Sequence, residues 1–123
     1  MILVVDDDPQ VRATIGHALT SLGYAVCEAA DGEAALELVR SEPLSLVILD
    51  YIMPGMDGAE VAREIAQLDE NLPIIFSTGH SALRALRTAA GEDVSILEKP
   101  FTLDELDELV RERLVERRRA RSA

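Results

Sequence analysis

Residues 46–50 read LVILD, four apolar side chains in a row followed by an aspartate. A continuous apolar run of this length is typical of a strand buried on both faces, as in a parallel sheet. Three further apolar runs end on polar residues in the same way: 2–5 before Asp6 and Asp7, 74–76 before Thr78, and 96–97 before Lys99. Since the carboxyl ends of parallel strands share one edge of the sheet, these polar side chains are expected to converge there.

The segments between these runs have helical patterns. We expect strands at 2–5, 24–28, 44–49, 74–77 and 94–97, and helices at about 9–22, 32–40, 58–68, 81–90 and from 103 onward. Helix starts are marked by Asp8-Pro9 and by a capping box of Thr102 and Glu105. The last helix is expected to bury one face, formed by Leu103, Leu106, Val110 and Leu114. This alternation predicts an α/β domain: a five-stranded parallel sheet with helices on both faces, whose strand order the pattern leaves open.

Charge is unevenly placed along the 123 residues. Residues 111–123 hold six arginines and two glutamates, a local charge of +4, which leaves −15 on residues 1–110. A body this acidic is expected to repel nucleic acid and anionic membranes. We therefore predict a single domain at 1–116 followed by an arginine-rich tail at 117–123. The tail is interpreted as a solvated helix end that complements the helix dipole, with a binding arm as the alternative.

Cellular location is predicted from what the sequence lacks. No apolar stretch approaches eighteen residues, and the N-terminus lacks the basic start and apolar segment of a signal peptide. Cys27 is the only cysteine, so no internal disulfide can form, which fits a reducing compartment. We expect a cytoplasmic protein that does not bind a membrane, and we interpret Cys27 as part of strand packing.

Four motifs carry a family resemblance: VVDDD at 4–8, LDYIMPGMDG at 49–58, STG at 77–79 and EKPF at 98–101. Together they resemble the receiver domain of bacterial two-component response regulators, over essentially the whole chain. The resemblance implies a doubly wound sheet of order 2-1-3-4-5 with five helices. It also implies a phosphoryl-accepting switch rather than an enzyme, one that assists only its own phosphorylation and slow dephosphorylation. Stand-alone receivers and the receivers of hybrid histidine kinases are the most similar kinds.

The acidic residues are the expected reaction centre. Carboxylates about 4 Å apart repel by about 4 kcal/mol per pair at an effective dielectric constant of about 20, and a hard divalent cation relieves this repulsion. By resemblance, Asp50 accepts the phosphoryl group, and Asp7, Asp50 and the Ile52 carbonyl bind Mg²⁺ or Mn²⁺, while Asp6 helps largely through water. The alternative is that Asp6 and Asp7 merely cap the first helix.

Three further residues complete the expected phosphoryl site. By resemblance, Thr78 donates a hydrogen bond to a phosphoryl oxygen, and Gly79 leaves room for the group. Lys99, the only lysine in the chain, supplies a neutralising cation. The resemblance also implies a cis peptide bond before Pro100. The alternative for Thr78 and Lys99 is that they are ordinary strand-end residues. Asp57-Gly58 is expected to turn the chain into a helix.

Three positions depart from the family pattern or bear on the lifetime of the phosphoryl group. Ile96 occupies a place where receivers commonly carry Tyr or Phe, so no aromatic side chain can swing inward there. Ile52 and His80 stand two residues after the acceptor and two after the threonine, where polar side chains orient the attacking water. Ile52 cannot hydrogen-bond water, whereas the imidazole of His80 is able to do so, and slow self-dephosphorylation is expected.

The expected partners are a histidine kinase or a histidine phosphotransfer protein as donor, and a downstream protein. The downstream protein, or a second copy in a homodimer, would bind the surface formed by 81–90, 94–97 and the last helix. One alternative is a docking or dimerisation module that needs no phosphorylation. Another is an aspartate-nucleophile phosphohydrolase, which would want an acid at position 52. A flavin carrier is disfavoured because only 3% of the residues are aromatic.

Overall fold

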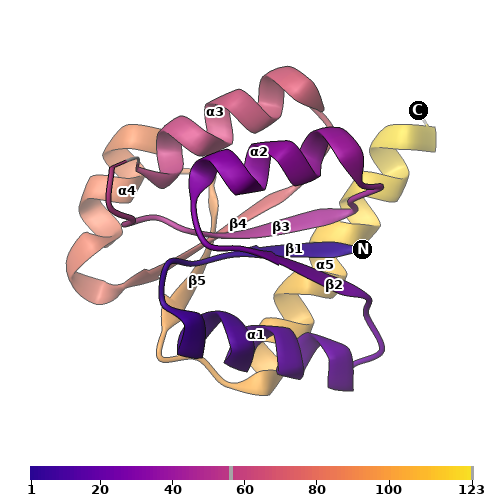
Figure 1. The fold of residues 1–123 in the computed structure, drawn as a ribbon, viewed down its shortest axis with the longest axis horizontal. Helices are drawn as coiled ribbons and strands as arrows, with labels where there is room; N and C mark the ends of the chain where they lie inside the picture. Colours follow the sequence, from indigo (N-terminus) through magenta and orange to yellow (C-terminus); the bar gives the residue numbers. More distant parts are fainter. Residues whose placement is uncertain (56, 123) are drawn as a thin grey trace.

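The computed structural model describes residues 1–55 and 57–122, with the backbone only at 118–122. The elements follow in the order β1 (Ile2–Val5), α1 (Pro9–Ser21), β2 (Val26–Ala29), α2 (Gly32–Ser41), β3 (Leu46–Asp50), α3 (Gly58–Leu68), β4 (Ile74–Gly79), the short 3₁₀ helix η1 (His80–Ala82), α4 (Leu83–Ala90), β5 (Ser95–Lys99) and α5 (Leu103–Ser122) (Figure 1). The expected alternation of strands and helices is confirmed.

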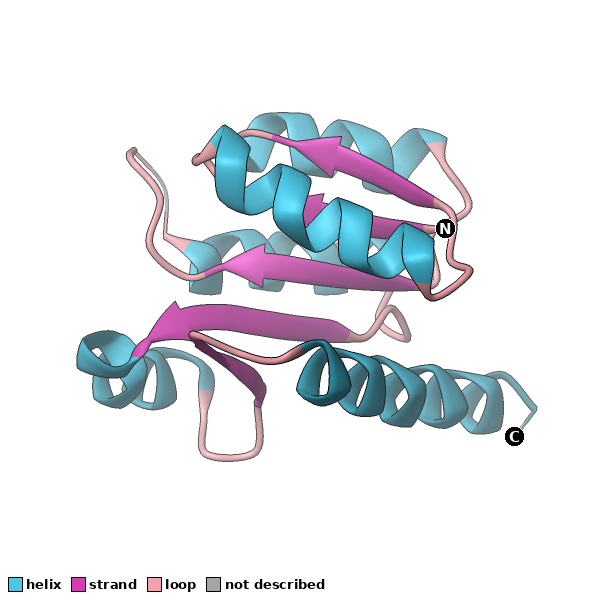
Figure 2. Cartoon of the chain, turned by 90° about the horizontal axis from the view of Figure 1, so that it is seen from below, coloured by secondary structure: helices cyan, strands magenta, loops and turns pink. Residues whose placement is uncertain are grey.

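The five strands form one parallel sheet of order β2-β1-β3-β4-β5, as the resemblance implies. Side chains of a strand alternate between two cores. Val47 and Leu49 pack with residues of α2, α3 and α4, whereas Leu46 and Ile48 pack with α1 and α5. Helices therefore cover both faces of the sheet, as Figures 1 and 2 show. Because both faces are covered, the strands can be apolar along their whole length.

Strand boundaries differ from the expected ones. The strands β3, β4 and β5 run on to Asp50, Gly79 and Lys99, because their ladders continue past the apolar runs. At the other end, β2 and β3 begin two residues later than expected, at the ladder positions opposite Ile2. The helix α4 also begins late, since residues 80–82 form the 3₁₀ turn. Asp50, Thr78 and Lys99 therefore belong to the sheet, which fixes their backbones, whereas Asp6 and Asp7 follow the end of β1.

The helix caps are as predicted, but one expected core residue is wrong. The Asp8 carboxylate caps α1, and Thr102 and Glu105 form the capping box. On α5, Leu106 and Val110 are buried and Leu114 packs beside them. Leu103, however, is 50% exposed. It lies in the first turn of α5 and packs on neither core, so the apolar face begins one turn later than the periodicity suggests.

The arginine-rich tail predicted from residue 117 onward begins within α5, which runs from Leu103 to Ser122, as expected of a helix end. Arg117 is only 6% exposed, and its Nη2 donates to Asp69 Oδ2 over 3.2 Å. The solvated-end interpretation is therefore wrong for Arg117, because its side chain is buried and pairs with Asp69, the residue that follows α3. The side chains of Arg118, Arg119 and Arg121 lie outside the described part.

Two smaller expectations concern the membrane and the cysteine. Across residues 1–55 and 57–122, no helix has both the length and the apolar composition needed to cross a bilayer. Cys27 is half-buried in β2 and packs against the core beneath α2, as interpreted from the sequence. Burial is the main cause that raises the pKa of its thiol.

Candidate functional site

Asp6 follows β1 and is fixed from several directions. Its N–H continues the ladder to the Ala29 carbonyl, and one carboxylate oxygen accepts a hydrogen bond of 2.9 Å from the Asp8 N–H. The other oxygen lies 3.4 Å from Lys99 Nζ. Only 2% of the residue is exposed. Asp8 alone caps α1, by accepting from the N–H groups of Gln10 and Val11, so Asp6 and Asp7 are not needed as caps.

Asp50 ends β3 beside this turn and is 8% exposed. One oxygen each from Asp6, Asp7 and Asp50 lies within 4.8 Å of the others. The predicted convergence of three carboxylates is therefore found in the structure. Lys99 reaches the same place from β5, with Nζ 3.7 Å from Asp50 Oδ1. Its ammonium thus contacts two buried carboxylates, although the lysine side chain is still 30% exposed.

The environment of Asp50 disfavours its charged form. Burial first, and then the negative charge of Asp6, raise the pKa of Asp50 to about 6, with a smaller push from Asp7. The Lys99 charge and the Ile52 N–H, which donates to the Asp50 carboxylate, act in the opposite direction but only partly compensate. The cluster thus holds excess negative charge that a bound cation would neutralise.

This cluster fits a hard divalent cation. It offers carboxylate oxygens, the ligand type that Mg²⁺ prefers, and one oxygen from each of the three side chains lies within 4.8 Å of the others. Asp7 is exposed, so the cation could keep several waters on the open side. The residues present are therefore compatible with the Mg²⁺ that the resemblance implies.

Thr78 and Gly79 end β4, next to β3. Thr78 is 2% exposed, and its hydroxyl has one long bond of 3.4 Å to the Gly79 carbonyl. This weak bond leaves the hydroxyl available to a better acceptor. A Cβ built on Gly79 would meet no atom within 4 Å, so the space in front of it is open. The Lys99–Pro100 peptide bond is cis, in agreement with the resemblance.

Within the described part of the chain, neither the His80 nor the Ile52 side chain makes a polar contact with the clustered carboxylates. The His80 side chain is 90% exposed, and its Nδ1 lies 2.9 Å from Glu98 Oε1 on β5. Ile52 is 62% exposed. Its side chain thus presents an apolar surface to solvent close to Asp50. Ile96 pairs with Phe76 in the sheet register and packs on the core beneath α4.

Two residues of the site were missed by the sequence reasoning. Ser77 is the ladder neighbour of Asp50, is 1% exposed, and its hydroxyl has no partner among the described residues. Gly58 was expected only to turn the chain. A Cβ there would lie 2.8 Å from the Asp50 carbonyl oxygen and from Tyr51 Cα. The first residue of α3 therefore packs directly against the backbone that carries Asp50, and position in the tertiary structure was the only signal for this.

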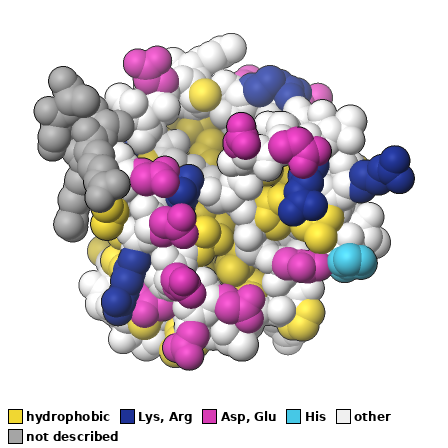
Figure 3. Space-filling model, turned by 180° about the vertical axis from the view of Figure 1, so that it is seen from behind, with side chains coloured by type: hydrophobic (Ala, Val, Ile, Leu, Met, Phe, Trp, Pro, Cys, Tyr) yellow, Lys and Arg dark blue, Asp and Glu magenta, His cyan; other side chains and the backbone are white. Residues whose placement is uncertain are grey.

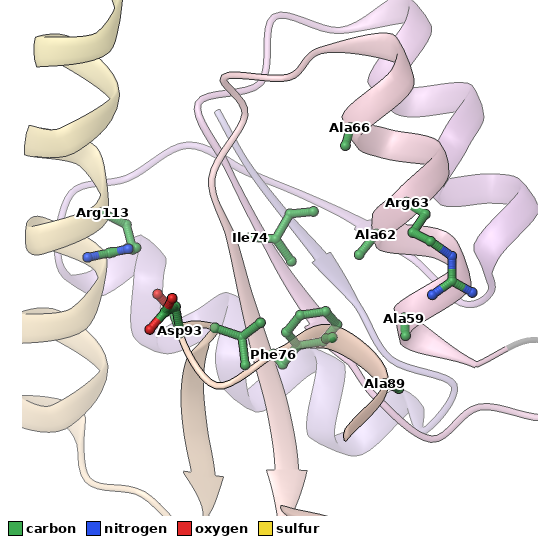
Figure 4. Close-up of a pocket in the computed structure, with 12 residues that line it drawn as sticks. Ala59, Ala62, Arg63, Ala66, Ile74, Phe76, Ala89, Asp93 and Arg113 are labelled. Atoms are coloured by element: carbon green, nitrogen blue, oxygen red, sulfur yellow. The ribbon is translucent and has the colours of Figure 1, made fainter. Parts of the chain in front are cut away.

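The surface away from the carboxylates has two further features. A groove of about 490 Å³ lies between α3 and α4, where small side chains such as Ala59, Ala62 and Ala89 face Ile74 and Phe76 (Figure 4). None of the clustered aspartates lines it. On the side opposite to Figure 1, acidic side chains are spread over most of the face, with basic ones between them (Figure 3). This fits the expected acidic body.

Comparisons with known proteins agree with this geometry. Residues 2–111 match the family model described as the response regulator receiver domain. The chain is 42% identical over 107 residues to the response regulator MprA of Mycolicibacterium vanbaalenii, covering 85% of this chain and 46% of that protein. It is 40% identical over 107 residues to the response regulator receiver protein CpdR of Brucella abortus, covering 85% of this chain and 88% of that protein. The crystal structure of the receiver domain of NtrX from Brucella abortus has a TM-score of 0.86 and 29% identity, and covers 93% of this chain and 98% of that domain. The chain thus spans about half of the length of MprA and most of CpdR.

Proposed function

Because the chain belongs to the response regulator receiver domain family, we propose that Asp50 takes a phosphoryl group from a phosphohistidine donor and that the surface of α4, β5 and α5 reports the change. The observation that carries the proposal is the convergence of Asp6, Asp7, Asp50 and Lys99 at one end of the sheet. An Asp50 oxygen forms a bond to phosphorus while the bond from phosphorus to the donor imidazole nitrogen breaks. The donor histidine leaves with that electron pair.

The charged residues around Asp50 have separate roles in this step. The Lys99 ammonium lies close enough to neutralise an oxygen of the transferred group, and Thr78 exchanges its long bond to Gly79 for a phosphoryl oxygen. Asp7, Asp50 and the Ile52 carbonyl are the proposed ligands of Mg²⁺ or Mn²⁺, with Asp6 acting largely through water. The cation supplies charge neutralisation for the phosphoryl oxygens when bound.

Acetyl phosphate with Mg²⁺ tests the assignment of the acceptor. We expect intact-mass measurement to find one added phosphate on wild type and none on Asp50→Asn, because the amide cannot form the acyl phosphate. Asp93→Asn, at an exposed position in the loop before β5, is the matched control and should be phosphorylated like wild type. Phosphate added to Asp50→Asn would assign the acceptor elsewhere.

We expect a long phosphoryl lifetime that Ile52→Asn shortens. Hydrolysis needs an oriented water, and the exposed Ile52 side chain cannot hydrogen-bond one. One good hydrogen bond is worth about 1 kcal/mol, so the asparagine should speed hydrolysis about fivefold. The decay of the phosphorylated mass measures this, with Ile52→Leu as the apolar control. His80 is a second candidate for orienting this water, although its ring contacts Glu98. An unchanged or longer lifetime in Ile52→Asn would contradict the role assigned to position 52.

Signal readout in this receiver cannot rely on an aromatic side chain at position 96. Phosphorylation draws Thr78 and the loop after β4 toward Asp50, and aliphatic repacking around Ile96 passes this movement to α4.

The partners are a histidine kinase or histidine phosphotransfer protein, and a downstream protein or a second copy on α4, β5 and α5. We place this exchange in the cytoplasm. The excess acidic side chains argue against nucleic acid or an anionic membrane as a partner of the domain itself.

A further inference from the structure

Arg12 on α1 contacts the backbone of the acidic site, although the chemistry above does not use it. Its Nη1 donates to the Asp6 carbonyl oxygen over 2.8 Å, and its Nε donates to Glu28 Oε1 over 3.1 Å. The side chain is 19% exposed. One guanidinium therefore joins α1 to the turn after β1 and to β2. A planar guanidinium holds two such acceptors in a fixed relation, which a lysine ammonium does not.

The contact with Asp6 lies one peptide bond away from Asp7. The Asp6 N–H still belongs to the ladder with β2, but its carbonyl lies beyond the end of β1 and accepts from Arg12. Because a peptide unit is planar, holding this oxygen also fixes the direction in which the chain continues to Asp7. Arg12 thus sets the start of the turn that presents the exposed carboxylate.

Asp6 and Asp7 differ in how their side chains are held. Both oxygens of the Asp6 carboxylate have partners, in the Asp8 N–H and in Lys99. None of the hydrogen bonds found within residues 1–55 and 57–122 involves the Asp7 carboxylate. The direction of Asp7 therefore depends on its backbone, which Arg12 holds on one side.

Glu28 in turn holds Arg12 in place. It points from β2 toward α1, and a Cβ built on Gly16, one turn after Arg12, would lie 3.4 Å from Glu28 Oε2. The absence of a side chain at position 16 leaves room for this carboxylate against the helix. The helix, the glutamate and the arginine thus form one packed unit beside the turn.

We propose that Arg12 is a positioning residue that orients Asp7 toward the divalent cation, and that Glu28 keeps Arg12 in that role. The inference rests on the proposed function, since it concerns the cation that Asp7 would bind. It makes a prediction of definite sign. Removal of a positive charge beside an acidic site strengthens cation binding by simple electrostatics, whereas loss of positioning weakens it.

The test is to titrate the full chain, freed of metal, with Mg²⁺ alone and to measure the Mg²⁺ affinity by isothermal titration calorimetry. We expect Arg12→Met to weaken Mg²⁺ binding about tenfold, as loss of an outer-shell contact typically does, and Glu28→Gln to weaken it by a smaller factor. The double variant should bind no more weakly than Arg12→Met alone. Arg84→Met, which removes an arginine of α4, is the charge control and should not weaken binding.

Unfolding in urea without metal separates positioning from a structural role. A purely structural arginine would lower stability and leave the Mg²⁺ affinity of the folded chain unchanged. If wild type binds Mg²⁺ and Arg12→Met binds it equally or more tightly, the positioning role of Arg12 is refuted, while the proposed function still stands. Wild type that neither binds Mg²⁺ nor accepts phosphate overturns the proposed function and the inference with it. If Arg12→Met does not fold, Arg12→Lys is measured instead, since it keeps the positive charge but lacks the planar guanidinium. A Mg²⁺ affinity of Arg12→Lys equal to that of wild type would refute the positioning role of Arg12.

Discussion

Without metal at about pH 7, Asp50→Asn is expected to be more stable than wild type by about 2 kcal/mol. The folded protein raises the pKa of Asp50 from 3.8 to about 6, mainly by burial and by the charge of Asp6. One pKa unit corresponds to about 1.4 kcal/mol, so the full shift gives about 3 kcal/mol, and partial solvation of this edge reduces the expected value. The amide removes this cost because it carries no charge.

The sign of the pH dependence follows from the raised pKa. A carboxyl that is easier to protonate in the folded state favours folding fully below its unfolded pKa of about 4, and this contribution is lost as the pH rises through about 6. The stability advantage of Asp50→Asn should therefore be small near pH 4 and should open between about pH 4 and 7.

Urea unfolding of both proteins across this pH range measures the difference in stability, in which the titration of groups remote from Asp50 cancels. Asp93→Asn, at an exposed carboxylate outside the site, should track wild type at every pH. Added Mg²⁺ should reduce the difference in unfolding free energy between Asp50→Asn and wild type, since it stabilises wild type, whose complete carboxylate cluster binds the cation. A gap of constant size from acid to neutral pH would show that burial of Asp50 does not set its ionisation.

Gly58→Ala is expected to cost about 2–3 kcal/mol of stability and most of the phosphorylation rate. The new Cβ would lie 2.8 Å from the Asp50 carbonyl oxygen and from Tyr51 Cα, closer than real Cβ contacts allow. Both atoms belong to the backbone, so the end of β3 or the start of α3 must move. The Gly58 N–H also donates to the Tyr51 carbonyl over 2.7 Å, which resists this movement.

The two effects of Gly58→Ala are measured separately. Urea unfolding gives the stability, with Gly79→Ala as a matched control, since a Cβ there meets no atom within 4 Å. Phosphorylation by acetyl phosphate is then compared at a temperature where both proteins are folded. Wild-type stability and phosphorylation rate in Gly58→Ala would mean that the end of β3 and the start of α3 move apart at little cost. The close packing of Gly58 on the Asp50 backbone would then not matter for phosphorylation.

Much of the site was predictable because local pattern sufficed. Apolar runs that end in Asp6, Asp50 and Lys99 identify buried parallel strands, and parallel strands bring their carboxyl ends together whatever their order. The caps at Asp8 and Thr102 were equally readable, because a cap is a contact between residues two or three apart. The order of the strands was not readable from the pattern, and it came from the family resemblance.

The remaining features depend on which residues distant in sequence become neighbours. Arg117 was taken for a solvated helix end, but the packing of α5 carries it to Asp69, 48 residues away. His80 stays a candidate for orienting water, and only the structure places its ring 2.9 Å from Glu98 on the neighbouring strand. The roles of Gly58 and Arg12 likewise follow from contacts with the backbones of Asp50 and Asp6. The sequence by itself thus determined the fold class and the acidic edge of the sheet. Strand burial is visible as short apolar runs, and helix caps involve residues only two or three positions apart. Only the tertiary structure decided which side chains hold that edge in place. Those contacts join residues of different elements, so they depend on how each helix packs on the sheet.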